Sequence, residues 1–406
     1  MPEVRNDDAP AASPAETAPH GRAPRRNRAP WLWGGGAVLA LVVGGIAIGT
    51  ANATVYSPEA QVQDYLDALA AGDGGTALAL AAGAGDEDGE RPGAAGLAPG
   101  TATSLMHGEP LQAGMAALGE LTVNRGADAP DGGSTEVEVG YTVDGEDRST
   151  TFTVEHTGRD WLFFDRWRMA PVPVQTVRVA PVNLPPEAAS GPVTAVVNGV
   201  QASLVPEGDE DSGHREDSGH REGSGTPGQA FAALPPLVVD AEFESTYLAA
   251  EPARLVVDQA TPADPATPAD PAGPGEPLLL ELALQYTDAV SEEVNRQLDA
   301  YLAGCTEQKV LHPSGCPMGY DTVNRIPPAS IAWSVSGDPR ATVVPLPAEG
   351  EDPTVMAPLQ AEAELSLQEI DLVSGEQRPV VHRDPFTLEA DLAVTGESVR
   401  LTPRIP

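Results

Sequence analysis

The stretch V-E-V-G-Y-T-V-D-G-E at residues 137–146 decides how the first third of the chain folds. Its apolar residues alternate with polar or small ones, and this period of two predicts a strand with one buried face. The alternating positions are Val137, Val139, Tyr141 and Val143. Asp144 and Gly145 follow, and an Asp-Gly pair is typical of a two-residue hairpin turn. The sequence therefore predicts an antiparallel meander around this turn.

The strands after the turn carry a large share of the aromatic residues. Phe152 lies in the next predicted strand, and W-L-F-F-D-R-W-R at residues 161–168 is predicted to form a further strand. Five of the 18 aromatic residues of the chain lie between residues 152 and 167. Because aromatic side chains bury large apolar areas, we expect the core of this part to be densest here.

The residues before the meander predict helices. Ser57 followed by Pro58 is a helix start signal, with a capping hydroxyl and a proline in the first turn. One apolar face then follows at helical spacing, formed by Val62, Tyr65, Leu66 and Leu69. A Gly/Asp turn at residues 72–75 separates this helix from a second at residues 76–82, and a short helix is expected around residues 101–118.

Further towards the N-terminus, the sequence predicts a membrane anchor. Residues 31–50 are an uncharged apolar run, long enough to cross a bilayer as a helix. Four arginines precede it: Arg22, Arg25, Arg26 and Arg28. The positive-inside rule then predicts a single-pass protein of the cell membrane, with a disordered cytoplasmic tail at 1–28, a transmembrane helix at 29–52 and extracytoplasmic domains. The alternative is a signal peptide cleaved after Ala53, at an A-x-A pattern.

The predicted span suggests two partners. The first is the lipid bilayer, through residues 31–50. The second is another copy of the chain, because small residues on one stripe let two helices approach closely. The stripe consists of Gly36, Ala40, Gly44, Gly45 and Gly49. Glycine is also common in membrane helices without any dimer, and this alternative stays open.

The order of these elements resembles a known family. The stretches that carry the resemblance are V-Q-D-Y-L-D-A-L-A-A-G-D at residues 62–73 and D-W-L-F-F-D-R-W-R at residues 160–168. Helix, Gly-Asp turn, helix and a Trp-rich meander after an anchor resemble the NTF2-like (cystatin-like cone) domains of uncharacterised bacterial membrane proteins. The resemblance covers residues 56–172 and implies a cone that can hold a small ligand.

Four polar residues are candidate contacts for a ligand or partner. His156 and Asp165 are the candidates for the interior of the cone that the resemblance implies. Arg166 and Arg168 share one face of a predicted strand, and paired guanidinium groups can bind a carboxylate or phosphate. Such arginines more often bridge acidic residues at the rim of a sheet, which is the structural alternative.

The rest of the chain predicts two further parts. Residues 173–260 read as a β-rich, sandwich-like module with an Asn198-Gly199 turn, interrupted by a low-complexity loop at 207–228 that holds D-S-G-H-R-E twice. A proline-rich linker at 261–277 leads to an α+β domain at 278–406, with a helix from Asp288 and an antiparallel sheet. Further strands are expected at 330–337, 341–346, 359–373, 379–394 and 397–402. The predicted class of the whole chain is α+β.

The two cysteines predict a disulfide. Cys305 and Cys316 are the only cysteines, and the predicted exterior location is an oxidising compartment. Cys305 ends the helix that begins near Asp288, and a His-Pro-Ser-Gly turn precedes Cys316. We expect this bridge to stabilise the last domain without a redox role. Two reduced, buried thiols are the structural alternative.

No catalytic motif supports an enzyme. The chain lacks the zinc-protease, redox-cysteine, nucleophile-elbow, phosphate-loop and dinucleotide fingerprints. His214 and His220 lie in the Gly/Ser-rich loop, and residues 86–90 match a calcium loop poorly, so we expect no metal or cofactor. The net charge of −37 also excludes nucleic-acid binding through the bulk surface.

The sequence therefore predicts a non-catalytic envelope protein that binds or senses another envelope component, an unknown protein or polymer. The alternative is a small-ligand carrier that uses the cone of the NTF2-like domain.

Overall fold

A computed structural model describes residues 54–82, 97–130, 132–161, 163–204, 228–258, 277–346 and 356–404. The chain separates into two compact units, Met1–Thr54 and Val55–Pro406, and the second is described below. Several predictions fall outside the described residues. They concern the tail 1–28, the span 29–52 with its small-residue stripe, the residues 86–90, and His214 and His220. The linker 261–277 and the loop 207–228 also lie outside the described residues, except for the last residue of each.

The described part of the chain is mostly β, so the predicted α+β class is wrong. Strands make up 46% of the structure and helices 20%, with four α-helices among the described residues. The strand content is high because one sheet has seven strands and another contains two strands of 12 and 18 residues. In the seven-stranded sheet, residues 278–283 pair with residues 177–182. Local periodicity does not show such pairing between distant segments.

The prediction of a single-pass membrane protein is also corrected. No helix in the described ranges is long and apolar enough to cross a membrane. The longest of them, α5 (Asp288–Thr306), has 19 residues and only one apolar face. Its charged residues are Asp288, Glu292, Glu293, Arg296 and Asp299. The predicted span itself, at residues 29–52, lies outside the described residues.

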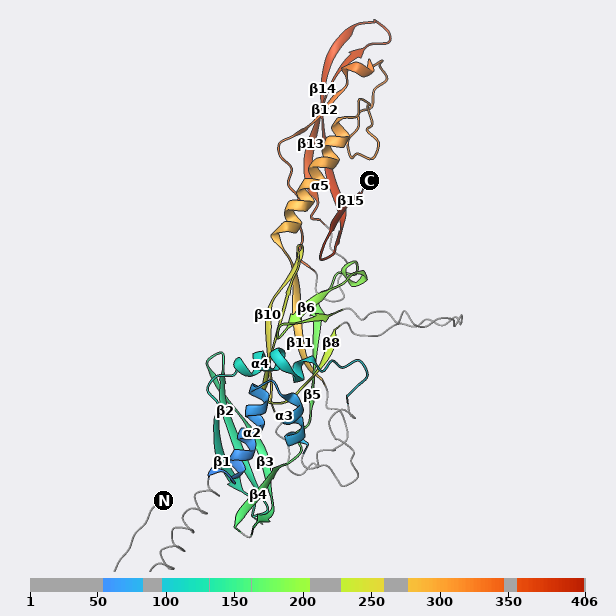
Figure 1. Cartoon of the computed structure of the whole chain (residues 1–406). Helices are drawn as coiled ribbons and strands as arrows, with labels where there is room; N and C mark the ends of the chain where they lie inside the picture. The colour runs from blue at the N-terminus through green and yellow to red at the C-terminus, as the bar shows by residue number, and fades with distance from the viewer. Residues whose placement is uncertain are drawn as a thin grey trace, which may run out of the picture. The chain divides into compact units, whose positions relative to one another are not determined.

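Three helices and a four-stranded antiparallel sheet form the first part (Figure 1). The helices are α2 (Pro58–Ala70), α3 (Gly74–Ala81) and α4 (Gly108–Ala116). The sheet has the order β1 (Thr122–Asp128), β2 (Ser134–Val143), β3 (Glu146–Asp160) and β4 (Phe164–Met169). The Ser57 hydroxyl caps α2 by accepting a hydrogen bond from the Ala60 N–H at 3.2 Å. Helix α2 contacts all four strands and buries its apolar face against them.

The aromatic stretch differs from its prediction. Strand β4 begins at Phe164, because Trp161 adopts a left-handed backbone (φ +52°) in the turn after β3. Trp161 is 87% exposed and Phe163 is 55% exposed, whereas Phe152 is fully buried. The prediction of a dense core between residues 152 and 167 is therefore wrong for Trp161 and Phe163, which lie on the surface.

One tyrosine connects this part to the next. Tyr65 on α2 is fully buried, and its ring lies edge-on to Phe152 at 5.6 Å between centroids. Its hydroxyl donates a hydrogen bond to the Pro235 carbonyl at 2.5 Å. Burial raises the pKa of Tyr65 above its ordinary value, so the hydroxyl stays a donor. The bond ties α2 to the segment that precedes strand β9.

The middle sheet has seven strands in the order β7-β6-β9-β10-β11-β5-β8. Their bounds are β5 (Gln175–Val182), β6 (Thr194–Val197), β7 (Val200–Ser203), β8 (Gln229–Ala233), β9 (Leu237–Glu244), β10 (Leu248–Val257) and β11 (Leu278–Tyr286). Strand β11 pairs in parallel with β5, and the other neighbours are antiparallel. The predicted boundary at residue 278 therefore differs from the structure, because β11 completes the middle sheet.

The Asn198-Gly199 turn does more than join two strands. Both residues have positive φ, at 45° and 83°, as the predicted hairpin turn requires. The Asn198 amide donates to the Val238 carbonyl at 2.9 Å and to the Pro110 carbonyl at 3.2 Å. Its oxygen accepts from the Asp240 N–H at 2.7 Å. Because Pro110 lies on α4, this side chain joins the turn to both strand β9 and the helix.

Helix α4 approaches strand β9 closely at Gly114. A Cβ atom at this position would lie 2.5 Å from the Val238 carbonyl oxygen and 2.5 Å from Leu237 Cδ1. No side chain fits in this space, so the glycine sets the distance between helix and sheet.

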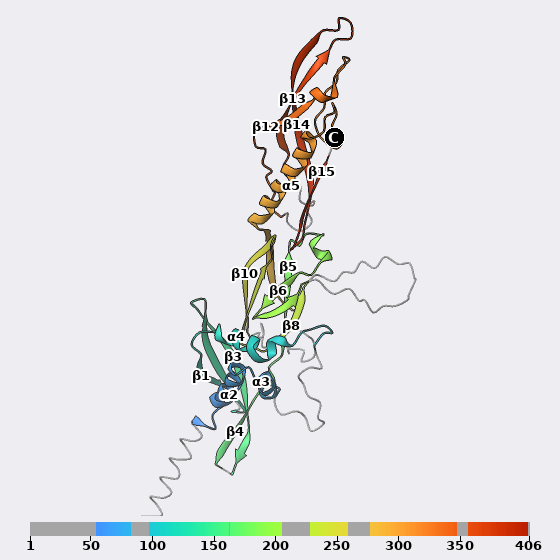
Figure 2. The same cartoon turned by 45° about the horizontal axis from the view of Figure 1, so that its top comes forward.

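The last part is a four-stranded antiparallel sheet with α5 on one face (Figures 1 and 2). Its strands are β12 (Ala332–Ser336), β13 (Leu359–Ile370), β14 (Gln377–Val394) and β15 (Val399–Arg404). The buried stripe of α5 consists of Val290, Val294, Leu298, Leu302 and Cys305. A strand predicted at residues 341–346 is absent from this described segment, where Val343 makes only an isolated bridge to Met356.

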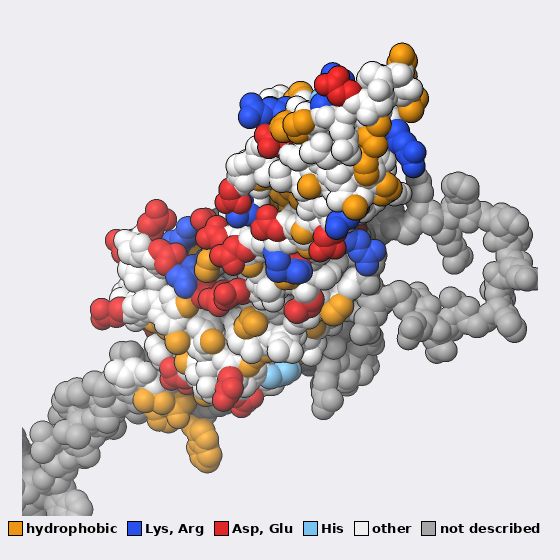
Figure 3. All heavy atoms as spheres, turned by 90° about the horizontal axis from the view of Figure 1, so that it is seen from above, with side chains coloured by type: hydrophobic (Ala, Val, Ile, Leu, Met, Phe, Trp, Pro, Cys, Tyr) orange, Lys and Arg blue, Asp and Glu red, His pale blue; other side chains and the backbone are white. Residues whose placement is uncertain are grey.

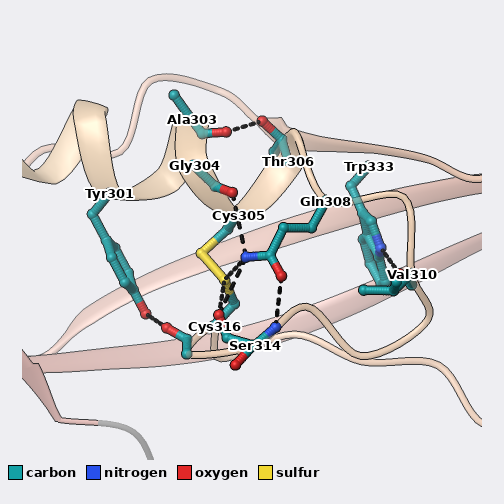
Figure 4. Close-up of a disulfide and its surroundings, with 11 residues drawn as sticks. Tyr301, Ala303, Gly304, Cys305, Thr306, Gln308, Val310, Ser314, Cys316 and Trp333 are labelled. Atoms are coloured by element: carbon teal, nitrogen blue, oxygen red, sulfur yellow. Dashed lines mark hydrogen bonds between the residues drawn. A yellow bond between two sulfur atoms is a disulfide. The ribbon is translucent and has the colours of Figure 1, made fainter.

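A disulfide joins the end of α5 to the following loop (Figure 4). Cys305 and Cys316 are bonded, with 5.8 Å between their Cα atoms. Gln308 supports the closed loop, because its side chain donates to the Ser314 carbonyl at 3.2 Å and accepts from the Ser314 N–H at 2.8 Å. The Tyr301 hydroxyl also donates to the Gly315 carbonyl at 2.8 Å.

Candidate functional site

The predicted pair His156 and Asp165 comes together on one face of the first sheet. The β3–β4 ladder pairs His156 with Trp167, and a register shift then lies between His156 and Gly158. This irregularity places Arg159 opposite Asp165. Bulges of this kind re-aim side chains and are frequent next to functional sites.

Asp165 lies between the side chains of Arg159 and His156. Arg159 Nε donates to Asp165 Oδ1 at 2.7 Å, and His156 Nε2 lies 3.3 Å from the same oxygen. The hydrogen bond from Arg159 is the largest cause that lowers the pKa of Asp165, and His156 adds to it. Asp165 is therefore ionised at neutral pH, and it lacks the raised pKa that suits a general acid.

An aromatic face completes the site. The His156 ring lies edge-on to Trp167 at 4.9 Å between centroids, and the Arg125 guanidinium carbon lies 5.8 Å from the Trp167 ring centre. Arg125 belongs to β1 and Trp167 to β4, so side chains from the two edge strands meet on this face. Arg125 also forms an ion pair with Asp128 at 2.8 Å. We call these side chains the inner-face cluster: Arg125, His156, Arg159, Asp165 and Trp167.

Two of the four predicted contact residues lie elsewhere. Arg166 and Arg168 are exposed, and they alternate along β4 with Asp165 and Trp167, so they point to the opposite face of the sheet. Arg168 pairs with Glu155 in the ladder, which is the position expected for a rim arginine beside an acidic residue.

Three residues of the inner-face cluster were not among the predicted contacts. The period of two already places Trp167 on the same face as Asp165, so this residue could have been found from the sequence. Arg159 could not, because only the register shift brings it opposite Asp165. Arg125 could not either, because its strand lies at the other edge of the sheet.

The inner-face cluster is suited to binding. Its carboxylate is held by Arg159 and His156, and no serine or cysteine belongs to it. Within the described residues, no group of three or more His, Cys, Asp and Glu side chains could hold a metal ion. The cluster can present guanidinium groups and an aromatic face to a ligand.

A second surface feature lies at the end of the same sheet. Val55 is 63% exposed and Tyr56 is 39% exposed, and the Tyr56 ring lies 4.7 Å from the Phe164 ring between centroids. Trp161 and Phe163 lie in the adjoining turn. We call this surface the aromatic end: Val55, Tyr56, Trp161, Phe163 and Phe164.

On the face drawn in Figure 3, Asp and Glu side chains lie among arginines and apolar side chains rather than in one block. The structure also pairs many arginines with acids, such as Arg254 with Asp240 at 2.6 Å. This distribution is typical of a solvated surface.

No protein-family model matches this chain, and no curated protein or solved structure matches it either.

Proposed function

We propose that this chain is a non-catalytic binding protein that recognises another protein through its aromatic end. The observation that carries the proposal is the exposure of Trp161, at 87%, in a chain with five tryptophans. Trp, Tyr and Arg are the residues that contribute most to protein interfaces. All three types occur at this end of the sheet, because Tyr56 contacts Phe164 and Arg159 precedes Trp161 by two residues in the chain.

The backbone at Trp161 supports a role in recognition. A φ of +52° is rare for a bulky side chain, and such conformations cost of the order of 1–3 kcal/mol. An Asn or Gly in this turn would avoid the cost. A tryptophan that is both strained and exposed gains nothing from burial, so its contribution to stability is small. Contact with a partner gives a reason for its presence.

We also propose that residues 56–172 form an NTF2-like domain. Three helices and a four-stranded antiparallel sheet, with α2 across one face, support this assignment.

Replacing Trp161 tests the proposed function. We expect Trp161→Ser to weaken binding of the partner about tenfold, because an exposed anchor of this kind typically contributes 1–2 kcal/mol or more. The partner is first captured by the full chain with a photoreactive benzoylphenylalanine in place of Trp161. Affinity is then measured with the purified partner.

Leu279→Ser is the matched control, since Leu279 is 50% exposed on β11 of the middle sheet. It should leave the affinity unchanged. Equal affinity of the Trp161→Ser chain and the unmodified chain would contradict the proposal.

A second candidate function is small-ligand binding at the inner-face cluster. The observation that favours it is the Trp167 ring, which has Arg125 at 5.8 Å and His156 at 4.9 Å. A planar anion could stack on the ring and replace Asp128 as the partner of the Arg125 guanidinium.

The planar anionic dye anilinonaphthalene sulfonate is a suitable probe for this site. Both Trp167→Leu and Arg125→Gln should weaken dye binding about tenfold if stacking and charge each contribute about 1.4 kcal/mol. Fluorescence titration of the full chain gives the affinity. Trp161→Ser is the control. If this variant weakens dye binding and the first two do not, the dye does not bind at the inner-face cluster.

A further inference from the structure

The β13–β14 hairpin ends in a second exposed apolar surface, distant in sequence from the aromatic end. Val373 is 98% exposed and Leu372 is 67% exposed in the turn between the two strands. Val323 is 87% exposed, and it lies two residues from Arg325, which exchanges both backbone hydrogen bonds with Ile370 at the end of β13. We call these three side chains the hairpin tip. In Figures 1 and 2 the hairpin extends beyond the end of α5.

The turn that carries the hairpin tip is held by its own hydrogen bonds. Asp371 Oδ1 accepts from the Val373 N–H at 2.9 Å, the Ser374 N–H at 2.7 Å and the Ser374 hydroxyl at 3.0 Å. The Asp371 and Gly375 backbone groups close the turn, with Gly375 N–H donating to the Asp371 carbonyl at 2.9 Å. Leu372 and Val373 are thus presented on an ordered turn, where polar residues are the usual choice.

An ion pair between the buried carboxylate of Glu369 and the exposed Arg378 supports the base of the hairpin tip. Glu369 is 2% exposed and accepts from Arg378 Nη2 at 2.6 Å and from the Thr322 hydroxyl at 2.6 Å. These bonds join both strands of the hairpin to the loop that carries Val323. Because the hairpin tip is already ordered, it loses less conformational entropy when a partner binds.

The charges around the hairpin tip indicate the chemistry of its partner. Glu376 is exposed, and the Asp321 side chain is 98% exposed. Asp371 is also acidic, Asp321 pairs with His312, and Arg378 is already paired with Glu369. The exposed Arg325 offsets one of the remaining negative charges, so the surroundings of the hairpin tip are acidic on balance. We propose that the hairpin tip inserts Leu372 and Val373 into an apolar pocket of a second protein, whose rim is basic.

A second copy of this chain is a poorer occupant. Each chain carries a net charge of −37, so two copies repel each other. The acidic side chains near the hairpin tip would add to this repulsion, whereas a basic rim would offset them. The proposal goes beyond the function assigned to the aromatic end, because it gives the chain a second interface and hence the ability to bridge two proteins.

Photocrosslinking of the full chain tests the proposal. Benzoylphenylalanine replaces Val373, and the chain is irradiated in the cells that produce it. We expect one discrete adduct with another protein.

The adduct alone is not sufficient, so the partner is purified and its affinity for the chain is measured. Leu372→Ser should weaken binding about tenfold, as expected for an apolar anchor. Glu376→Lys and added salt should also weaken binding, as expected for a basic rim.

Val381→Ser is the matched control for folding and for general hydrophobicity. Val381 is 62% exposed on β14, opposite Ser366 in the ladder and away from the turn. This variant should bind as the unmodified chain does. Three results would overturn the proposal: no adduct from position 373, an adduct of the chain with itself, or an affinity that Leu372→Ser, Glu376→Lys and salt leave unchanged.

Discussion

Replacing Gly114 by alanine is expected to lower the free energy of unfolding by about 3 kcal/mol, at the upper end of the usual range for overpacked sites. The added Cβ would lie 2.5 Å from the Val238 carbonyl oxygen and 2.8 Å from the Asn198 amide nitrogen. The first of these atoms is backbone in strand β9, so it cannot rotate away. Helix α4 must therefore move, and the Asn198 hydrogen bonds to Pro110 and Val238 weaken with it.

Urea denaturation of the full chain, followed by circular dichroism, measures this effect. Gly304→Ala is the matched control, because Gly304 lies in α5 and an added Cβ would meet no atom within 4 Å beyond the helix's own backbone. Alanine favours a helix over glycine by about 1 kcal/mol, so this variant should be slightly more stable than the unmodified chain. If Gly114→Ala is as stable as Gly304→Ala, the close approach of α4 to β9 is wrong.

The second large effect is expected from loss of the disulfide. Replacing Cys305 and Cys316 together by alanine should lower the free energy of unfolding of the last part by about 3 kcal/mol, from the chain entropy of the closed loop. The cysteines are 11 residues apart, and Cys305 is 1% exposed. The Gln308 and Tyr301 hydrogen bonds remain in the variant, so the loop should loosen without the whole sheet unfolding.

Hydrogen exchange of residues 305–316 measures loosening of the loop, and urea denaturation measures unfolding of the sheet. The unmodified chain under reducing denaturation should approach the stability of the double variant. Gln308→Ala is a suitable control, because it removes two hydrogen bonds to Ser314 but keeps the loop closed. We expect it to cost about 1–2 kcal/mol, clearly less than the disulfide. A double variant as stable as the unmodified chain would show that the bridge has no structural role.

Local patterns correctly predicted several elements of this fold. The helix after Ser57, the alternation through Val137 and the Asn198-Gly199 turn all lie where the sequence places them. Each depends on residues within a few positions of one another, so the preference is written in the local sequence. The cysteine pair is similar, since a chain with two cysteines allows only one bridge.

The same local patterns predict the wrong fold class and the wrong burial of Trp161. Trp161 was assigned to a strand and a core because it is aromatic, but the turn after β3 turns it outward. Strand β11 was assigned to the last part, although its parallel partner β5 lies about 100 residues earlier in the chain. The uncharged run at residues 31–50 led to a single-pass topology, whereas no helix in the described segments of the chain could cross a membrane.

The candidate sites show most clearly which features follow from the sequence and which follow from the tertiary structure. By itself the sequence determined which polar residues were available, and the family resemblance made His156 and Asp165 candidates for one interior. Only the tertiary structure decided that Arg159 joins them through a register shift, that Arg125 reaches Trp167 from the far edge strand, and that Leu372 and Val373 end the hairpin in solvent. The physical reason is that helices and turns depend on neighbours along the chain. Strand partners, register and exposure instead depend on contacts between residues far apart in the sequence, and local periodicity does not record them.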